Sequence, residues 1–302
     1  MIKKIAIIND ISGYGRCSTS VILPIVSYLG IQGCPLPTAI FSNHTGFPSF
    51  FCKDFTAYMP AYIEEWKKLD LHFDGIMTGF LGSARQIAIV EDFIQHFRRE
   101  STTVIVDPVM GDNGRIYPTY TDELCQKMRR LVAYADITTP NLTEACSLTN
   151  TPYHDGPWRR SELDTLARHI LDMGARQLVI TGVPMGTGYI GNVIAGRTIP
   201  TTFQRQTIVK ETRSGTGDVF AGVIAADALN GIDFTASVKK ASRFVRQCLT
   251  DTLRTETGTT SLASGCKTSS NSENTTIPAS EANAPRNTGI EFESTLYKLK
   301  RT

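Results

Sequence analysis

The chain has 302 residues, of which 41% are hydrophobic, and its 31 Lys and Arg residues against 29 Asp and Glu residues give a formal net charge of +2. This length is ample for burying a hydrophobic core, either in one large α/β domain or in two smaller ones. The balanced charge, without a long basic run, gives no electrostatic reason to expect binding to nucleic acid or to an anionic membrane.

Short β-branched runs alternate with longer segments of helical period along most of the chain. We predict strands at 4–9, 73–79, 103–107, 135–141, 177–182 and 188–194, and helices at 18–30, 84–99, 121–135, 216–231 and 233–253. Strands separated by helices of this length predict βαβ units, and hence a mainly parallel sheet covered by helices on both faces. A hairpin around 188–200 should extend one side of this sheet.

The composition changes sharply after the last predicted helix. Residues 255–289 are rich in Ser, Thr and Asn and contain no aromatic residue. Such a segment cannot bury enough apolar surface to offset the entropy lost on ordering it. We therefore predict a disordered insertion at 255–288, with residues 290–299 packing back on the protein. No other boundary or internal repeat is evident, so residues 1–302 are interpreted as a single domain.

The seven cysteines and the N-terminus bear on the cellular compartment. The cysteines are scattered and odd in number, and none forms a C-x-x-C pair, which is a poor basis for a disulfide framework. The N-terminal sequence MIKKIAIIND enters a strand-like run without the apolar segment and cleavage site of a signal peptide. No run of 18 apolar residues is present either. We expect a soluble, cytoplasmic protein with reduced thiols.

The segment RSGTGDVFAG at 213–222 is the strongest local signal for a functional site. Gly215 and Gly217 allow a tight turn and a close approach of the backbone to a ligand. A helix that begins near Thr216 would present unpaired N–H groups, which together with the helix dipole form an anion site. Asp218 would repel a bound phosphate unless it accepts a proton from an attacking hydroxyl group. The alternative interpretation is that Asp218 is only an acidic residue at a helix start.

Further polar residues follow three predicted strands. Asp107 and Asp112 belong to VDPVMGDNG, Asn141 and Glu144 belong to TPNLTEA, and ITG ends the strand at 177–182. In an open parallel sheet, ligands bind outside the carboxyl ends of the strands. Acidic and amide groups gathered there suit a metal–nucleotide complex, since Mg²⁺ takes one or two carboxylates, water molecules and phosphate oxygens. Each acidic residue taken alone could equally be a helix cap or a solvated loop residue.

The motifs DPVMGD, TPNLTEA and GTGD, in this order, resemble the ribokinase superfamily and in particular its vitamin-kinase branch. NDISGYGR (9–16), FSNHTGF (41–47) and TGFLG (78–82) are similar to motifs of the pyridoxal kinases, which phosphorylate the aldehyde, amine and alcohol forms of vitamin B6. The resemblance covers residues 3–253 and 289–299 and departs from the family at the polar insertion. It implies a ribokinase-like three-layer α/β/α fold with a mainly parallel central sheet. No G-x-x-x-x-G-K-S/T loop is present, so the P-loop class is excluded.

The resemblance also implies catalytic roles. Asp218 would be the general base for the 5′-hydroxymethyl group of the B6 vitamer, and Gly215, Thr216 and Gly217 would form the anion hole for the transferred phosphoryl group. Glu144 and Asp112 would hold Mg²⁺, mostly through water molecules. The ATP site would be lined by Asn141, Asp112, Glu144, Thr181 and Thr216, and a monovalent cation, K⁺, would be surrounded by Asp107, Thr139 and Thr181.

For the vitamer ring, the resemblance implies contacts from several short motifs. Asp10, Ser12 and Thr45 would hydrogen-bond the pyridine ring, Phe80 would pack on its face, and His44 would contact the substrate unless it is a structural histidine. Relatives have a neutral residue where this chain has Asp10, and a carboxylate there could shift the preference among B6 forms. The resemblance further implies a homodimer.

Two other functions stay open at this point. Hydroxymethylpyrimidine kinases belong to the same branch, but their first motif carries SSGG where this chain has SGYG. A catalytically inactive homologue that binds pyridoxal phosphate or nucleotide is the other possibility, against which the intact Asp218 and Glu144 argue. Turnover of ATP with pyridoxal, with hydroxymethylpyrimidine and with neither would separate the three.

Overall fold

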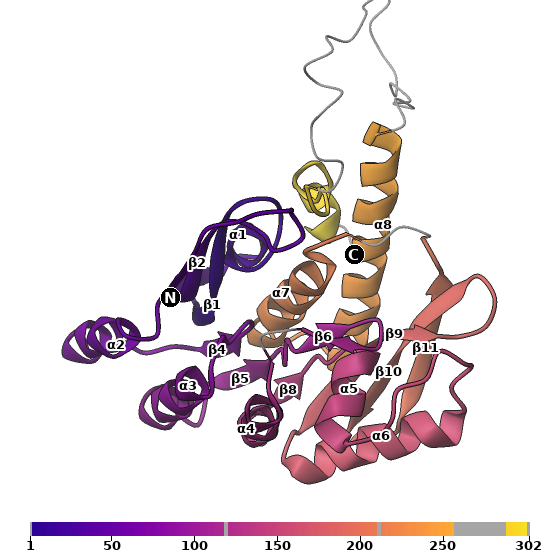
Figure 1. Cartoon of the computed structure of the whole chain (residues 1–302), viewed down its shortest axis with the longest axis horizontal. Helices are drawn as coiled ribbons and strands as arrows, with labels where there is room; N and C mark the ends of the chain where they lie inside the picture. Colours follow the sequence, from indigo (N-terminus) through magenta and orange to yellow (C-terminus); the bar gives the residue numbers. More distant parts are fainter. Residues whose placement is uncertain (1, 118–119, 210–212, 257–287, 301–302) are drawn as a thin grey trace, which may run out of the picture.

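The computed structural model describes residues 2–117, 120–209, 213–256 and 288–300 (Figure 1). The insertion predicted to be disordered at 255–288 lies outside these ranges except at its ends. There, residues 255 and 256 complete helix α8 (Phe234–Glu256), and the carbonyl of Thr288 accepts a hydrogen bond from the backbone of Arg16. No helix in the described ranges is both long and apolar enough to cross a membrane.

The described strands form one main sheet in the order β11–β10–β9–β8–β5–β4–β1–β2–β3. Their bounds are β1 (Lys4–Tyr14), β2 (Gln32–Asn43), β3 (Cys52–Asp54), β4 (Gly75–Thr78), β5 (Thr103–Val106), β8 (Ile137–Thr138), β9 (Gln177–Pro184), β10 (Tyr189–Gly196) and β11 (Thr202–Thr207). The strands from β9 to β2 run parallel, whereas β3, β10 and β11 pair antiparallel. The predicted mainly parallel sheet is therefore confirmed, and the predicted hairpin is formed by β10 and β11. A separate small ladder joins β6 (Gly111–Asp112) to β7 (Arg115–Ile116).

Helices cover both faces of the sheet and complete the three predicted layers (Figure 1). One face carries α2 (Met59–Lys68), α3 (Ala84–Phe97), α4 (Asp122–Val132), α5 (Leu142–Thr149) and α6 (Arg160–Met173). The other carries α1 (Thr19–Tyr28), α7 (Thr216–Leu229), α8 and the 3₁₀ helix η1 (Glu293–Lys300). Successive residues of β1 alternate between the two cores, since Ile5 and Ile7 pack with α1, α7 and α8, whereas Ala6 and Ile8 pack on the other face. This alternation is expected of a strand that is covered on both sides.

Some elements differ from the sequence-based prediction. The first strand, predicted at 4–9, continues to Tyr14, with a register shift against β2 between Asn9 and Ile11. Strand β2 was not predicted; it contains Pro35 and Pro37, which cannot donate a ladder hydrogen bond and are rare inside sheets. The missed helix α6 does carry a helical spacing of buried residues, Leu163, Leu166, Ala167 and Ile170.

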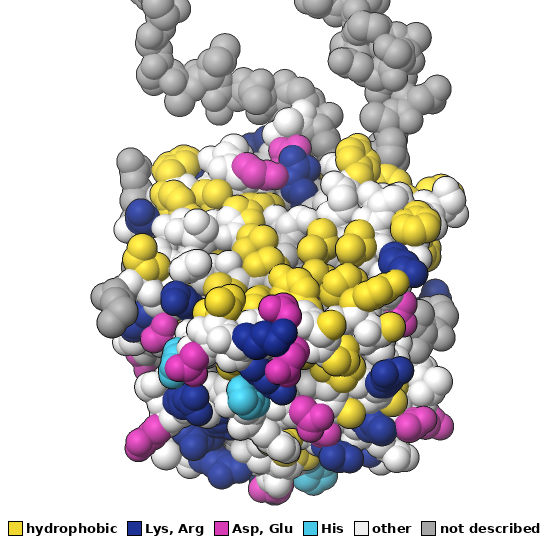
Figure 2. Space-filling model, turned by 90° about the vertical axis from the view of Figure 1, so that its left-hand side faces the viewer, with side chains coloured by type: hydrophobic (Ala, Val, Ile, Leu, Met, Phe, Trp, Pro, Cys, Tyr) yellow, Lys and Arg dark blue, Asp and Glu magenta, His cyan; other side chains and the backbone are white. Residues whose placement is uncertain are grey.

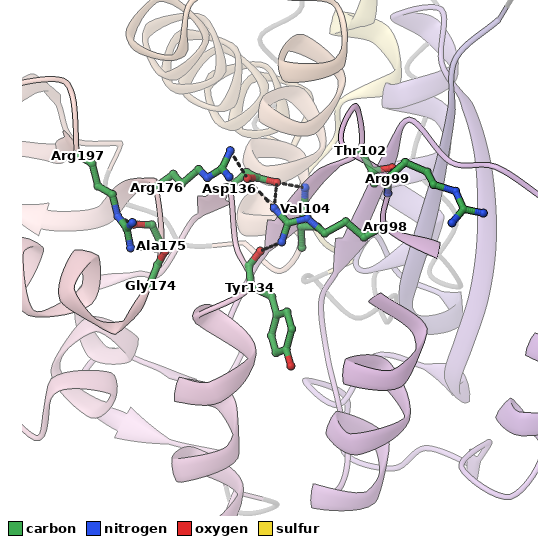
Figure 3. Close-up of polar contacts among 10 residues, drawn as sticks. All are labelled: Arg98, Arg99, Thr102, Val104, Tyr134, Asp136, Gly174, Ala175, Arg176 and Arg197. Atoms are coloured by element: carbon green, nitrogen blue, oxygen red, sulfur yellow. Dashed lines mark hydrogen bonds and ion pairs between the residues drawn. The ribbon is translucent and has the colours of Figure 1, made fainter. Parts of the chain in front are cut away.

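Asp136, just before β8, joins the amino-terminal ends of three parallel strands (Figure 3). Its carboxylate accepts hydrogen bonds from the backbone N–H of Val104 at 2.8 Å and from Nη2 of Arg98 at 3.0 and 3.1 Å. Nη1 of Arg176 lies 3.3 Å from the same carboxylate. A surface cavity of about 910 Å³ opens beside these residues. Because the contacts of this carboxylate tie the starts of β5 and β9 and the end of α3 to β8, we interpret this edge as structural.

Asp136→Ala should lower the free energy of unfolding by about 2–4 kcal/mol, because it leaves Nη2 of Arg98 and the Val104 N–H without their carboxylate acceptor. Arg176→Gln is the matched control: the Arg176 side chain is 68% exposed, so losing its ion pair should cost less than about 1 kcal/mol. Urea denaturation of the three proteins measures both values. Equal losses in the two variants would contradict this account of the network.

Candidate active site

The carboxyl ends of the central parallel strands bring several predicted residues together. The sheet register aligns Ile8 of β1 with Thr78 of β4, Thr78 with Val106 of β5, and Val106 with Thr138 of β8. The residues that follow each of these four positions therefore emerge at one edge of the sheet. They are Asn9, Gly79, Asp107 and Thr139.

Asp107 and Thr139 form one pair at this edge. The Thr139 hydroxyl donates to Oδ1 of Asp107 at 2.9 Å, and Asp107 is only 8% exposed. Burial and the negative charge of Asp218, opposed by the Thr139 hydrogen bond, together raise the pKa of the Asp107 carboxyl to about 8. Thr181, the third residue predicted to surround a monovalent cation, lies in β9, where its N–H donates to the carbonyl of Pro140 at 2.9 Å.

Asn141 and Glu144 are held by a capping box at the start of α5. The Asn141 side chain accepts from the Glu144 N–H at 3.0 Å, and Oε2 of Glu144 accepts from the Asn141 N–H at 2.8 Å. Oε1 of Glu144 also accepts from the Met110 N–H at 3.1 Å, and Nδ2 of Asn141 donates to the Gly111 carbonyl at 2.8 Å. Both side chains therefore fix the loop after β5 on α5. Asp112 is exposed on that loop.

The turn before α7 has the form that the glycine motif predicts. Gly215 has a positive φ of 87°, and no side chain caps the helix. Thr216 directs its hydroxyl to the Arg213 carbonyl at 3.3 Å. A Cβ added to Gly217 would meet no protein atom within 4 Å. Since Gly costs about 1 kcal/mol relative to Ala within a helix, and no neighbouring protein atom requires it here, the open space above Gly217 points to a ligand.

Asp218 lies in the first turn of α7 and faces other carboxylates. It accepts hydrogen bonds from the Ser18 backbone N–H and from the Asn9 side-chain amide, yet burial still raises its pKa. The charge of Asp218 in turn raises the pKa values of Asp10 and Asp107. The structure therefore brings the predicted base, one predicted ring-binding residue and one predicted cation-binding residue into electrostatic contact.

Asp10 and Ser12 follow Asn9 along β1 and are both almost fully buried. The Ser12 hydroxyl donates to Oδ2 of Asp10 at 3.3 Å. Burial raises the pKa of Asp10 to about 6, because hydrogen bonds from Ser18 and Ser12 offset only part of the desolvation and Asp218 adds to it.

Asn9 is a central residue of this site that the sequence analysis did not single out. Its Oδ1 accepts the backbone N–H groups of Asp10 at 2.9 Å and Phe80 at 2.8 Å, which leaves its amide nitrogen as the donor to Asp218. A Cβ on Gly79 would lie 2.5 Å from this side chain, which accounts for the glycine in TGFLG. The sequence did contain one signal for Asn9, since it is a polar residue at the end of the apolar run KIAII.

The remaining predicted ring-binding residues, His44, Thr45 and Phe80, differ in burial and in their contacts. His44 is buried; its Nδ1 accepts the Gly46 N–H at 3.1 Å, and its ring centroid lies 4.5 Å from that of Phe47. These contacts suit a structural histidine. Thr45 is exposed, and Phe80 is half-buried with its ring edge-on to that of Phe41 at 6.2 Å.

Comparisons with known proteins agree on one family. The family model for phosphomethylpyrimidine kinase matches residues 26–263. A protein of Bacteroides thetaiotaomicron assigned as a phosphomethylpyrimidine kinase, crystallised with pyridoxal, has 36% sequence identity and a TM-score of 0.86, covering 99% of this chain and 96% of that chain. The pyridoxine/pyridoxal/pyridoxamine kinase of Bordetella avium is 29% identical over 252 residues, which are 78% of this chain and 81% of the relative. The pyridoxal kinase of Lactobacillus plantarum, at 22% identity and a TM-score of 0.82, covers 100% of this chain and 98% of its own and shares the fold.

Asp10→Asn should stabilise the protein at neutral pH but not at acidic pH. In the folded state Asp10 keeps its proton up to about pH 6, against 3.8 for an ordinary aspartate, so its charge destabilises the fold increasingly as the pH rises from about 4 to 6. Above pH 6 this cost is on the order of 3 kcal/mol. Urea denaturation at pH 4.5 and 7.5 should show a stability gain for the variant that is much larger at pH 7.5. A gain of the same size at both values would mean that Asp10 is ionised in the fold throughout.

Proposed function

Because the chain belongs to the phosphomethylpyrimidine kinase family, we propose that it transfers the γ-phosphoryl group of ATP to the 5′-hydroxymethyl group of a B6 vitamer, namely pyridoxal, pyridoxamine or pyridoxine. The observation that carries this proposal is the juxtaposition of Asp218 with the uncapped helix start at Gly215 and the open space above Gly217. The names of the relatives support it, since the Bordetella avium protein is a B6 kinase and the Bacteroides structure contains pyridoxal.

In this proposal Asp218 is the general base. The substrate hydroxyl must lose its proton as it attacks the γ-phosphorus, and a base works best when its pKa lies near the operating pH. Burial raises the pKa of Asp218 in this direction, while hydrogen bonds from Ser18 and Asn9 oppose the shift, favour the ionised carboxylate and fix its direction. The hydrogen bonds come from β1 and from the start of α1, so the base is oriented by elements outside its own helix.

The start of α7 would hold the transferred phosphoryl group. Phosphoryl transfer needs little covalent help, so positioning and charge stabilisation account for most of the catalysis. The N–H groups of Thr216 and Gly217 lie in the first turn of α7, where the helix dipole also favours negative charge. Gly217 leaves the room that a phosphate needs for a close approach to these N–H groups.

The buried carboxylates of the site suit cations that bind together with the nucleotide. The hydrogen-bond partners found for Asp10, Asp107, Glu144 and Asp218 are neutral hydroxyl, amide or backbone N–H groups. Within the described ranges, no three His, Cys, Asp or Glu side chains are grouped closely enough to bind a metal ion by themselves. This suits Mg²⁺ bound largely through water and phosphate oxygens.

Glu144 and Asp112 would hold that Mg²⁺, which neutralises phosphate charge when bound. Together with Glu144 and Asp112, the residues Asn141, Thr181 and Thr216 would line the nucleotide site. Asp107, Thr139 and Thr181 would hold K⁺, and the pairing of Thr139 with Asp107 supplies two adjacent oxygen atoms for it.

Asp10, Ser12, Thr45 and Phe80, with His44 nearby, would bind the vitamer ring. Burial of Asp10 and Ser12 beside Asp218 supports a ring site next to the base. We further propose that the protein works in the cytoplasm.

A homodimer is part of this proposal. Figure 2 shows hydrophobic side chains gathered on the side of the molecule that carries the β1–β2–β3 edge. There Ile40, Phe50, Phe51 and Tyr58 are 40, 46, 64 and 50% exposed. Exposed apolar groups of this kind commonly mark a protein interface, and a second copy of the chain would cover them.

Hydroxymethylpyrimidine phosphorylation is the second candidate, since the matched family model is named for a kinase of a related methylpyrimidine, phosphomethylpyrimidine. The two candidates differ in the ring that is bound and share Asp218 and the anion hole. Coupled ATP-turnover assays with pyridoxal, with hydroxymethylpyrimidine and without acceptor decide between them. We expect a higher kcat/KM with pyridoxal than with hydroxymethylpyrimidine. If neither compound is phosphorylated, both candidate functions are refuted.

Asp218→Asn should lower kcat by about 10²–10⁴-fold, because it removes the basicity and keeps the shape of the side chain. The affinity for ATP should stay the same or increase, since the repulsion between the carboxylate and the phosphates is relieved. Asp122→Asn is the matched control, because Asp122 is also an acidic residue in the first turn of a helix, α4. The proposal fails if Asp218→Asn turns over within a few-fold of the parent.

Asp112→Asn tests the metal assignment without disturbing the core. Asp112 is exposed, and an asparagine can still accept the Asn113 N–H that now donates to Oδ1 at 2.8 Å. We expect the Mg²⁺ concentration for half-maximal turnover to rise about tenfold or more, because a negatively charged group near the ion is lost. Titration of Mg²⁺ at fixed ATP measures this. An unchanged midpoint would remove Asp112 from the metal site.

A further inference from the structure

The segment Thr288–Glu293, which we call the C-terminal strap, lies against the two backbone turns that border the proposed phosphate site. It leads into η1, which lies beside α8 at the top of Figure 1. The strap is separated from both turns by long stretches of sequence, so its contacts are tertiary. None of the roles proposed above uses it.

The strap first contacts the loop after β1. The N–H of Arg16 donates to the Thr288 carbonyl at 2.8 Å, and Arg16 and Gly289 form a parallel bridge. Nε of Arg16 lies 2.8 and 3.0 Å from the two carboxylate oxygens of Glu293. Gly289 has a φ of 92°, and a Cβ there would lie 2.6 Å from the Arg16 carbonyl oxygen, so the approach requires glycine.

The strap also contacts the turn that begins α7. The N–H of Ile290 donates to the Ser214 carbonyl at 3.0 Å. A Cβ on Gly215 would collide with the Arg16 carbonyl oxygen and would lie 3.3 Å from the Ile290 side chain. Gly215 is thus enclosed between the strap and the Arg16 backbone, and its own carbonyl accepts the N–H of Val219 at 2.9 Å in the first turn of α7.

A third set of contacts fixes the strap on α8. The Glu291 N–H donates to the Thr252 hydroxyl at 3.0 Å, and Ile290 and Phe292 are buried in the core formed with α1, α7 and α8. Outside the strap, Lys298 of η1 makes a separate contact with Asp251 of α8 at 3.2 Å. The strap therefore connects three elements: the β1–α1 loop, the start of α7 and α8.

We propose that the C-terminal strap positions the anion hole, and that the Arg16–Glu293 ion pair holds the strap in place. Arg16 and Glu293 are positioning residues, since they act through Gly215 and Ser214 and not through the substrate. Displacements of about 1 Å in a catalytic group can cost about 10²-fold in rate, so a loosened strap lowers turnover. The proposed ring-binding residues Asp10 and Ser12 are held within β1, so their contacts with the vitamer should persist. The kinetic part of this inference rests on the proposed kinase function.

The test compares Glu293→Gln and Arg16→Gln with the charge-reversed double variant Arg16→Glu/Glu293→Arg. Each single variant should lower kcat about tenfold, with KM for the vitamer within twofold and the melting temperature within about 3 °C, since the Glu293 side chain is 55% exposed and such pairs add little stability. The double variant should recover most of the lost kcat. Lys298→Gln, which loosens η1 from α8 and leaves Arg16 and Glu293 intact, is the matched control with parental kcat.

Hydrogen–deuterium exchange provides a readout that does not depend on activity. In Glu293→Gln the Val219 and Ile290 amides should exchange at least about fivefold faster than in the parent, with helix α3 unchanged. If the parent has no B6 kinase activity, the proposed function fails, and the exchange result still decides on the strap. Any of three results would overturn the inference. The first is that both amides exchange as in the parent, and the second is that kcat in the single variants stays within twofold of the parent. The third is that the double variant recovers none of the lost kcat.

Discussion

Burial of carboxylates side by side at the carboxyl edge of the sheet is the constraint on which the site depends. Asp10, Asp107 and Asp218 come from different elements, yet the charge of Asp218 raises the pKa of both others. Each carboxylate is hydrogen-bonded by neutral groups, which lessen the cost of desolvation without cancelling the charge. A cation or a transferred proton therefore gains more from binding here than it would at the surface. The same repulsion that weakens the fold prepares the site for chemistry.

Asn9 makes this arrangement possible because its amide joins three parts of the site. Its oxygen holds the backbone of Asp10 and Phe80, so its nitrogen is directed to Asp218. Strand register brings Asn9 beside Gly79 and Phe80, since Ile8 and Thr78 are aligned one position earlier, and helix α7 brings Asp218 to the same edge. Strand β1 thus has two roles, because it contributes side chains to both cores and its Asn9 supports Asp218, the proposed base.

Features that depend on residues close together in the sequence were predicted, whereas features that depend on contacts between distant segments were not. The parallel sheet and its three layers follow from local periodicity, and the sharp turn at Gly215 follows from the residues of GTGD. The partners of Asp218, Asn9 and Ser18, lie about two hundred residues earlier in the chain, and no local pattern pairs them. The capping box of Asn141 and Glu144 was visible as N-x-x-E, but its effect on the Met110 loop depends on tertiary contacts. Strand β2 was missed because Pro35 and Pro37 contradict the usual strand composition.

The open space above Gly217 separates stability from activity at this position. The Cβ of an alanine there would meet no neighbouring protein atom within 4 Å, and the helix itself would gain on the order of 1 kcal/mol from losing a glycine. Selection for a more stable protein would therefore favour replacing this glycine. Selection for turnover would oppose it if, as we propose, the phosphate occupies this space. In that proposal, a Gly217 variant that expresses well and melts late would be a poor enzyme. A ranking of substitutions by their effect on stability alone would classify a Gly217 substitution as harmless.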